Sequence, residues 1–320
     1  MKKRKIIGLG LAAFITAISL ANASWLAGTP DGEMSLLAHR GVHQSYHREN
    51  LTNTTCTAAR IDEPSHSYIE NTIPSMRAAL VSGADMIELD VKLTTDRDIV
   101  VFHDETLDCR TDGTGKTHHK SLAHLKSLDI GYGYTADGGE SYPFRGQFVG
   151  AMPTLHEVLT EFPETYFMVN LKHGKASEGE AYRDYITAED ATRLGLVGSN
   201  RATAPVIEAY PEMVLQTRQN VKACLKGYAL TGWFGGMPEA CEKTYVPVPS
   251  NLRHFIWGWP HRFEKRLNAV GSRSMLLGPY EGHGSVDLDE VEHLRVVPKD
   301  YKGIVFTNKI EVIGPVLAPN

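Results

Sequence analysis

Runs of apolar residues alternate with amphipathic stretches along most of the chain. We predict strands at Ser35–Ala38, Ala84–Leu93, Ile99–His103, Thr165–Leu171, Phe255–Trp259 and Gly303–Thr307. We predict helices at Ile73–Ser82, at Thr154–Phe162, and over most of the segment from Lys175 to Asn200. Strand–helix alternation favours parallel βαβ units, and a length of 320 residues suits one (β/α)₈ barrel of the α/β class.

Two polar stretches do not follow this alternation. One runs from Gly41 to Glu70, and the other, rich in Gly, Tyr and Asp, runs from Leu107 to Gly150. We expect both to be long loops on one rim of the barrel, where loops of such length are usually functional.

The predicted strand around MIELDV carries two acids in an otherwise apolar run. Glu88 and Asp90 are two residues apart, so their side chains point to the same face of the strand. Two close carboxylates in a poorly hydrated site need a counter-charge, which a divalent cation supplies. Oxygen ligands favour Mg²⁺ or Ca²⁺ over zinc. We therefore predict that both acids are metal ligands.

Further polar residues follow other predicted strands and would meet at the same rim. His39 and His103 suit general acid–base catalysis, because the imidazole pKa is near neutrality. Arg40 and Lys172 suit an anionic substrate such as a phosphate. A metal, two histidines and two cations together indicate chemistry on a phosphoryl ester.

These motifs resemble those of the glycerophosphodiester phosphodiesterase family. The matching segments are His39-Arg40-Gly41, Glu70-Asn71-Thr72, Glu88-Leu89-Asp90-Val91, Thr94 with Asp96, His103-Asp104 and Met152-Pro153-Thr154-Leu155. The resemblance implies a TIM barrel with a small insertion, here 105–150, after the strand ending at His103. It also implies a divalent metal held by carboxylates and two catalytic histidines, His39 and His103.

The resemblance assigns roles to several positions. Glu88 and Asp90 would be metal ligands, Arg40 would bind the phosphate, and Glu70 would be a polar residue that supports the site. Asn170, two residues before Lys172, stands where the family usually has a glutamate that binds the metal. An amide oxygen can still bind Mg²⁺ or Ca²⁺, but without charge.

Two more departures set this chain apart from compact family members. The stretch after the first strand is longer and brings His43, His47 and Cys56 near the mouth of the barrel. The last strand ends in Thr307-Asn308, where many members have Thr-Asp. These differences indicate a divergent branch with altered substrate preference.

The N-terminus has the features of a secretory signal peptide. A basic start, MKKRK, precedes an apolar run and the sequence Ala21-Asn22-Ala23, which is an A-x-A cleavage site. We expect residues 1–23 to be removed, leaving one domain over 24–320 that is periplasmic or secreted and has no membrane span. The net charge of −5 does not suggest nucleic-acid binding.

Four cysteines are consistent with export to an oxidising compartment. Three pairings are possible, and we expect Cys56–Cys109 and Cys224–Cys241. The aromatic residues Trp233, Trp257 and Trp259 either line a pocket for an acyl chain or choline-like group, or serve as core and rim packing.

Three functions fit the sequence. The first is metal-dependent hydrolysis of a glycerophosphodiester to glycerol 3-phosphate and an alcohol. The second is phospholipase D-like hydrolysis of a lysophospholipid or sphingomyelin, since that group resembles the same family. The third is a non-catalytic barrel that binds metal and phosphodiester, against which the presence of both His39 and His103 argues. The expected partner is a small-molecule or lipid-derived phosphodiester.

Overall fold

The computed structural model describes residues 2–52, 54–282 and 286–317, and it divides into two compact units. The larger unit consists of Leu36–Leu215, Asp289–Val291 and the segment from Thr307 onward. The smaller unit consists of the segment up to Ser35, Gln216–Leu288 and Glu292–Phe306. Each unit is described by itself.

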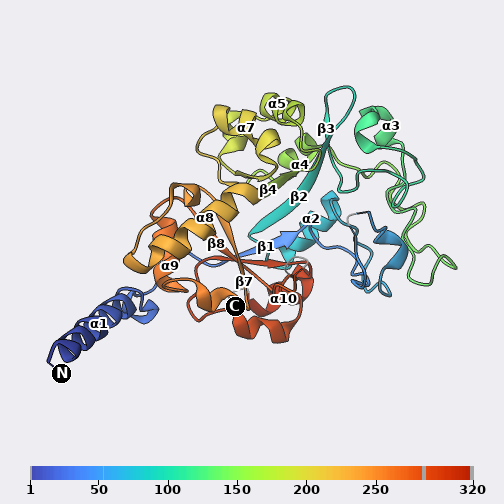
Figure 1. The fold of residues 1–320 in the computed structure, drawn as a ribbon. Coiled ribbons are helices and arrows are strands. Elements are labelled where there is room, and N and C mark those ends of the chain that lie inside the picture. Colours follow the sequence, from blue (N-terminus) through green and yellow to red (C-terminus); the bar gives the residue numbers. More distant parts are fainter. Residues whose placement is uncertain (1, 53, 283–285, 318–320) are drawn as a thin grey trace. The chain divides into compact units, whose positions relative to one another are not determined.

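Parallel strands form the centre of the larger unit (Figure 1). The strands are β1 (Ser35–His39), β2 (Met86–Leu93), β4 (Tyr166–Leu171) and β5 (Leu194–Gly198), in the spatial order β5-β4-β2-β1. Strand β2 is buried along nearly its whole length, as expected for a parallel strand covered on both faces. The register places His39 beside Glu88 and Asp90 beside Asn170.

Most helices of the larger unit begin at a Ser or Thr whose side chain caps the first turn. They are α2 (Ile73–Val81), α3 (Leu122–Lys126), α4 (Leu155–Glu161), α5 (Ala176–Tyr185), α6 (Ala188–Ala191), α7 (Asn200–Ala209) and α10 (Ile310–Leu317). The predicted capping box of α4 is confirmed: the Thr154 side chain accepts a hydrogen bond from the N–H of Glu157, and the Glu157 side chain accepts one from the N–H of Thr154.

Two predictions for the larger unit are wrong in part. The segment from Lys175 to Asn200 is mostly helical, as predicted, but not throughout, because its apolar end LGLVG forms strand β5 beside β4. Strand β3 (Ile99–Val101) is antiparallel to β2 rather than one of the parallel strands. It turns back through a short hairpin, and the N–H of Phe102 donates to the carbonyl of Asp90 over 2.9 Å. The hairpin therefore brings His103 beside the acids.

The long loop after β1 and the insertion 105–150 share one apolar cluster. Its members include Ala58, Ile61, Leu107, Leu125, Ile130, Tyr134 and Phe144. The predicted disulfide Cys56–Cys109 is confirmed and joins the two segments covalently. The two predicted loops thus pack together as one small layer. The sequence did not indicate this layer, because the apolar residues of the two segments are too dispersed to show a helical or strand period.

The smaller unit contains a parallel run of strands in the order β7-β8-β9. These are β7 (Tyr245–Pro249), β8 (Arg273–Leu277) and β9 (Ile304–Thr307), which agrees with the strand predicted at the last position. The remaining main elements are β6 (Leu215–Thr217), α1 (Lys2–Ala21), α8 (Arg218–Thr231) and α9 (His261–Asn268). Cys224 in α8 forms the second predicted disulfide with Cys241.

The strand predicted at Phe255–Trp259 is wrong. A 3₁₀ turn spans Arg253–Phe255, and the segment after it bends at Gly258, whose φ of 75° lies in the left-handed region. Gly258 and Pro260 interrupt the apolar alternation that suggested a strand.

Helix α1 covers most of the predicted signal peptide. Its apolar residues include Phe14, whose ring meets that of Trp233 edge-on at 5.9 Å between centroids. Among the described residues, none of the helices combines the length and the apolarity needed to cross a membrane. Cleavage after Ala23 and export stay predictions.

Candidate active site

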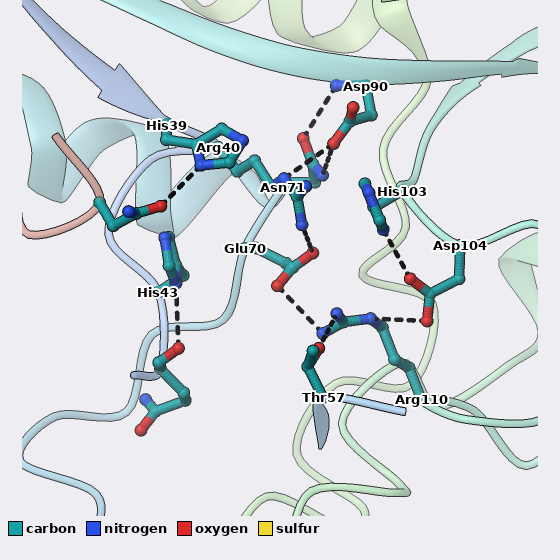
Figure 2. Close-up of polar contacts among 12 residues, drawn as sticks. His39, Arg40, His43, Thr57, Glu70, Asn71, Asp90, His103, Asp104 and Arg110 are labelled. Carbon is teal, nitrogen blue, oxygen red and sulfur yellow. Dashed lines mark hydrogen bonds and ion pairs between the residues drawn. The ribbon is translucent and has the colours of Figure 1, made fainter. Parts of the chain in front are cut away.

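Two carboxylates of β2 form the centre of the candidate site, and Figure 2 shows one of them, Asp90, with the residues around it. Glu88 and Asp90 lie on the same face of the strand, as predicted, and both are buried. The neighbouring strands contribute His39 and Asn170 at the matching levels of the sheet. The pairing of parallel strands thus brings residues from three segments to one point.

Asp90 is surrounded by donors and cations. Its oxygens lie 3.0 Å from Arg40 Nε and 3.4 Å from Lys172 Nζ. Asn71 Nδ2 donates to Asp90 Oδ2 over 3.2 Å. Burial by itself would raise the pKa of Asp90, but Arg40 and Lys172 outweigh it and hold that pKa well below the usual range. Asp90 is therefore a permanent anion in this site.

Glu88 lies in a different electrostatic situation. Burial, followed by the charge of Asp90, raises the pKa of Glu88 above its usual range. Its Oε2 is shielded from solvent and has no hydrogen-bond partner in the described part of the chain. A buried carboxylate oxygen without a donor is costly unless a cation or ligand meets it.

Asn170 completes the oxygen-rich end of the site. Its Nδ2 lies 3.2 Å from Glu88 Oε1 and 3.3 Å from Asp90 Oδ1, so the amide faces both acids. An amide can present either its nitrogen or its oxygen by rotation. The unpartnered Glu88 oxygen, the Asp90 carboxylate and this amide fit a hard divalent cation, as the sequence predicts.

His39 is held by a chain of neutral and acidic side chains. Its Nδ1 lies 2.6 Å from Asn308 Oδ1, and Asn308 Nδ2 donates to Asp289 Oδ2 over 2.9 Å. Because Asn308 donates to Asp289 through Nδ2, its Oδ1 is the atom that faces the His39 ring. An amide oxygen can only accept, so Nδ1 of His39 must carry the hydrogen. Nε2 then faces Glu88, whose Oε2 is 3.7 Å away.

His103 is held by a carboxylate instead. Its Nδ1 lies 2.7 Å from Asp104 Oδ1, and Arg110 Nε donates to Asp104 Oδ2 over 2.9 Å. Burial and the charge of Arg40 lower the pKa of His103, while Asp90 and Asp104 oppose the shift. For His39 burial is again the largest cause, with Arg40 next, and its pKa falls well below the normal value.

Glu70 joins two arginines of the site. Its oxygens lie 2.9 Å from Arg40 Nη1 and 3.0 Å from Arg110 Nη1. Burial would raise the pKa of Glu70, but Arg110 and Arg40 lower it to about 2. Glu70 thus links the two arginines, and its role as a residue that supports the site stays a prediction.

The backbone beside the site adopts conformations that side chains rarely take. Arg40 and Asn71 have φ values of 63° and 59°, and the N–H of Asn71 donates to the carbonyl of Arg40 over 2.9 Å. At Gly41, with φ of 81°, a Cβ atom would lie 2.6 Å from Ser75 Oγ. Left-handed residues of this kind cluster at functional sites.

A cavity of about 600 Å³ opens onto this site within the larger unit. Its lining includes Arg40, His103 and Lys172, together with residues of the long loop and the insertion such as Tyr46, Leu51, Cys56 and Cys109. The disulfide Cys56–Cys109 is therefore part of the cavity wall.

The two histidines of the long loop differ in position. His43 is buried, and its ring meets that of His39 at 6.1 Å between centroids. His47 is exposed and lies 3.6 Å from Asp62. His43 thus belongs to the packing around the site, whereas His47 lies at the surface.

Comparison with known proteins agrees with this geometry. The Glycerophosphoryl diester phosphodiesterase family matches residues 39–203, a range that includes His39, Glu88, Asp90, His103 and Asn170. The chain belongs to this family. A glycerophosphodiester phosphodiesterase of Caldanaerobacter subterraneus is 42% identical over 103 residues, 32% of this chain, and the chain spans 39% of that relative's length.

Solved structures of the family show that the fold is shared. The phosphodiesterase domain of a Mycobacterium tuberculosis protein has a TM-score of 0.62 at 16% identity and covers 89% of this chain and 98% of its own. A phosphodiesterase from Oleispira antarctica, in complex with the product sn-glycerol-3-phosphate, has a TM-score of 0.53 at 17% identity. The similarity covers 92% of this chain and 99% of the Oleispira antarctica chain. The predicted α/β fold, a (β/α)₈ barrel, is confirmed.

Several members of the site were missed by sequence reasoning. Asn71, Asp104, Arg110 and Asp289 hold the charged residues in place but were given no role. The adjacency of Asp104 to His103 was a usable signal, because a carboxylate next to a histidine often fixes its tautomer. Arg110 and Asp289 carry no local signal.

The three tryptophans named as candidate pocket residues lie in the smaller unit. Trp257 Nε1 donates to the carbonyl of Ala229 over 3.1 Å, and Trp259 packs 5.7 Å from the ring of Tyr301. Trp233 packs against Phe234 at 4.8 Å between centroids. These are packing contacts, and a pocket role for the three rings stays a prediction.

Proposed function

We propose that the protein hydrolyses a glycerophosphodiester, with His39 and His103 as the acid–base pair. One observation carries the proposal: both histidines have Nδ1 held by an acceptor, and His103 lines the cavity together with Arg40 and Lys172. Fixing Nδ1 commits Nε2 of each ring to the substrate. The cationic side chains of Arg40 and Lys172 then bind the phosphate, and the two imidazole rings accept and donate protons.

The partners of the two rings support a division of labour. The acceptor on His39 is a neutral amide, and burial strongly lowers the pKa of the ring, so His39 is neutral and free to take the proton of the attacking water or hydroxyl at Nε2. The acceptor on His103 is a carboxylate that favours the imidazolium, so His103 protonates the leaving alcohol oxygen. The attacker is water or a neighbouring hydroxyl of the substrate, which would give a cyclic phosphate.

A divalent cation, Mg²⁺ or Ca²⁺, would be held by Glu88 and Asp90, with the amide oxygen of Asn170 as a neutral third ligand. When bound, such a cation polarises the phosphoryl oxygens and stabilises negative charge. Arg40 and Lys172, both within 3.4 Å of Asp90, would bind the remaining phosphate oxygens.

We infer that the products are glycerol 3-phosphate and an alcohol. The family and the product named for the Oleispira antarctica relative support this substrate class. The basic, apolar N-terminus with its A-N-A sequence and the two disulfides support export to the periplasm or the medium.

A second candidate is phospholipase D-like action on a lysophospholipid or sphingomyelin. One observation favours it: the long loop tied by Cys56–Cys109 builds a cavity wall with apolar members such as Leu51 and Tyr46. This wall would suit a lipid-derived group attached to the phosphate.

The test is a substrate panel of choline, ethanolamine, inositol and glycerol diesters beside lysolipid micelles, with and without EDTA. We expect turnover of soluble glycerophosphodiesters, loss of activity in EDTA and recovery with Mg²⁺ or Ca²⁺. Full activity in chelator-treated protein would remove the metal assignment. Turnover of lysolipid alone would favour the second candidate, and no turnover of any diester would contradict both.

A further inference from the structure

A second group of possible metal ligands lies outside the proposed catalytic residues. It consists of Glu105, which follows β3, His118 in the 3₁₀ helix Thr117–His119, and His173, which follows β4. One candidate ligand atom from each residue lies within 4.8 Å of the other two. No role in phosphodiester hydrolysis has been given to any of the three.

His118 has a ring nitrogen that is available to bind a metal. Its Nδ1 is shielded from solvent and has no hydrogen-bond partner within the described ranges, since Glu105 Oε1, at 3.4 Å, is poorly placed for one. Its ring lies 4.0 Å from that of His173, centroid to centroid. The two imidazoles and the Glu105 carboxylate thus lie close enough together to share one metal.

Backbone hydrogen bonds hold the three segments in place. The N–H of Thr117 donates to the carbonyl of Glu105 over 3.0 Å, which ties the 3₁₀ helix to the loop after β3. The buried carboxylate of Glu178 accepts from the N–H of His173 at 3.0 Å. Lys92 Nζ donates to Glu105 Oε2 over 3.0 Å, which leaves Oε1 toward His118. Such supporting contacts are typical of residues around a metal site.

The charges nearby decide which metal class fits. Lys92 and Lys116 lie 3.0 and 4.0 Å from the carboxylate of Glu105. One carboxylate beside two lysines is a poor site for Mg²⁺ or Ca²⁺, which depend on several charged oxygens. Imidazole nitrogens instead suit zinc and related first-row metals.

The spacing is also compatible with a tetrahedral site. Zinc bonds of about 2.0–2.1 Å to nitrogen and oxygen imply ligand atoms roughly 3.3 Å apart. His118 Nδ1 and Glu105 Oε1 are 3.4 Å apart already. Only small side-chain rotations would bring His173 to the same spacing, since its ligand atom lies within 4.8 Å of both others.

We propose that Glu105, His118 and His173 bind one first-row transition-metal dication of the zinc class, with a coordination position left open. The bound metal joins the insertion 105–150 to the end of β4. Because Glu105 also lines the cavity of about 600 Å³, the metal would stiffen that wall. The site does not include Glu88 or Asp90, so it can be tested independently of the proposed hydrolase activity.

The test is Zn²⁺ binding to full-length protein that carries no histidine tag and has been stripped with chelator. Calorimetric titration in millimolar Mg²⁺ should give one Zn²⁺ per chain. His118→Ala and His173→Ala should each weaken that binding by at least about tenfold. The matched control is His119→Ala, because His119 is the exposed neighbour of His118 and is not one of the three ligands. Its binding should equal that of the parent.

Two further measurements guard against misfolded variants and other sites. Co²⁺ should give the visible absorption of a tetrahedral nitrogen–oxygen site in the parent and in His119→Ala, but not in His118→Ala. Zn²⁺ should also bind unchanged to Glu88→Gln. Absence of Zn²⁺ binding in the parent, an equal loss in His119→Ala, or a loss in Glu88→Gln with retention in His118→Ala would each overturn the proposal.

Discussion

Both histidines of the site have Nδ1 bound to an oxygen acceptor, but the two acceptors differ in charge. His39 meets the amide of Asn308 at 2.6 Å, and His103 meets the carboxylate of Asp104 at 2.7 Å. The amide fixes the ring without adding charge, whereas the carboxylate also stabilises the imidazolium. Nearly equal geometry with unequal charge is a way to give two identical side chains different proton affinities.

The two supports also differ in origin. Asp104 adjoins His103 in sequence and is backed by Arg110 from the insertion. Asn308 lies 269 residues from His39 and is backed by Asp289. The acid side of the site therefore depends on a local pair, and the base side depends on the return of the C-terminal segment to β1.

The largest effect is expected from removal of either ring. His39→Ala and His103→Ala should each lower kcat by roughly 10²–10⁴-fold, the usual size of a lost general acid or base. Steady-state kinetics on the best diester of the panel measures this, with circular dichroism to check folding. His47→Ala is the control, because His47 is exposed and pairs only loosely with Asp62 at 3.6 Å. A comparable loss in His47→Ala would show that the pair is misassigned.

A smaller loss is expected when the charged support is neutralised. Asp104→Asn keeps the shape of the side chain but removes the charge that favours protonated His103, so kcat should fall by about 10–10³-fold. The pKa of His103 should fall as well, which moves the basic limb of the kcat/KM profile to lower pH. An unchanged basic limb would mean that His103 is not the acid.

The reverse exchange tests the base. Asn308→Asp places a carboxylate on His39 and raises its pKa, since an adjacent anion favours the imidazolium. A base works only when neutral, so activity is lost as pH falls through that pKa. Raising it should move the acidic limb of kcat/KM upward by about one pH unit. If the basic limb moves and the acidic limb does not, the roles of the two rings are exchanged.

The smallest effect concerns the metal end of the site. Asn170→Glu adds a third carboxylate beside Glu88 and Asp90, so the metal concentration for half-activation should fall, because Ca²⁺ affinity rises with ligand charge. The added charge would repel an anionic diester, so KM should rise or stay unchanged. Metal titration after chelation measures both quantities. If neither Asn170→Glu nor Asn170→Ala changes metal affinity, Asn170 is not a ligand.

What the sequence determined by itself is local. The strand period of two places Glu88 and Asp90 on one face, and the capping residues Thr154 and Glu157 mark the start of α4, whatever the rest of the chain does. The ordered motifs from His39 to Thr154 indicated the family, and with it the barrel. These features rest on neighbours in sequence, so a single chain is enough to read them.

What only the tertiary structure decided is which distant residues meet. The bond between His39 and Asn308 and the joining of Glu105, His118 and His173 both depend on packing. No periodic pattern encodes such meetings, because each partner is satisfied by a segment tens to hundreds of residues away. Barrel closure and burial decide them, through the need to give every buried polar group a partner.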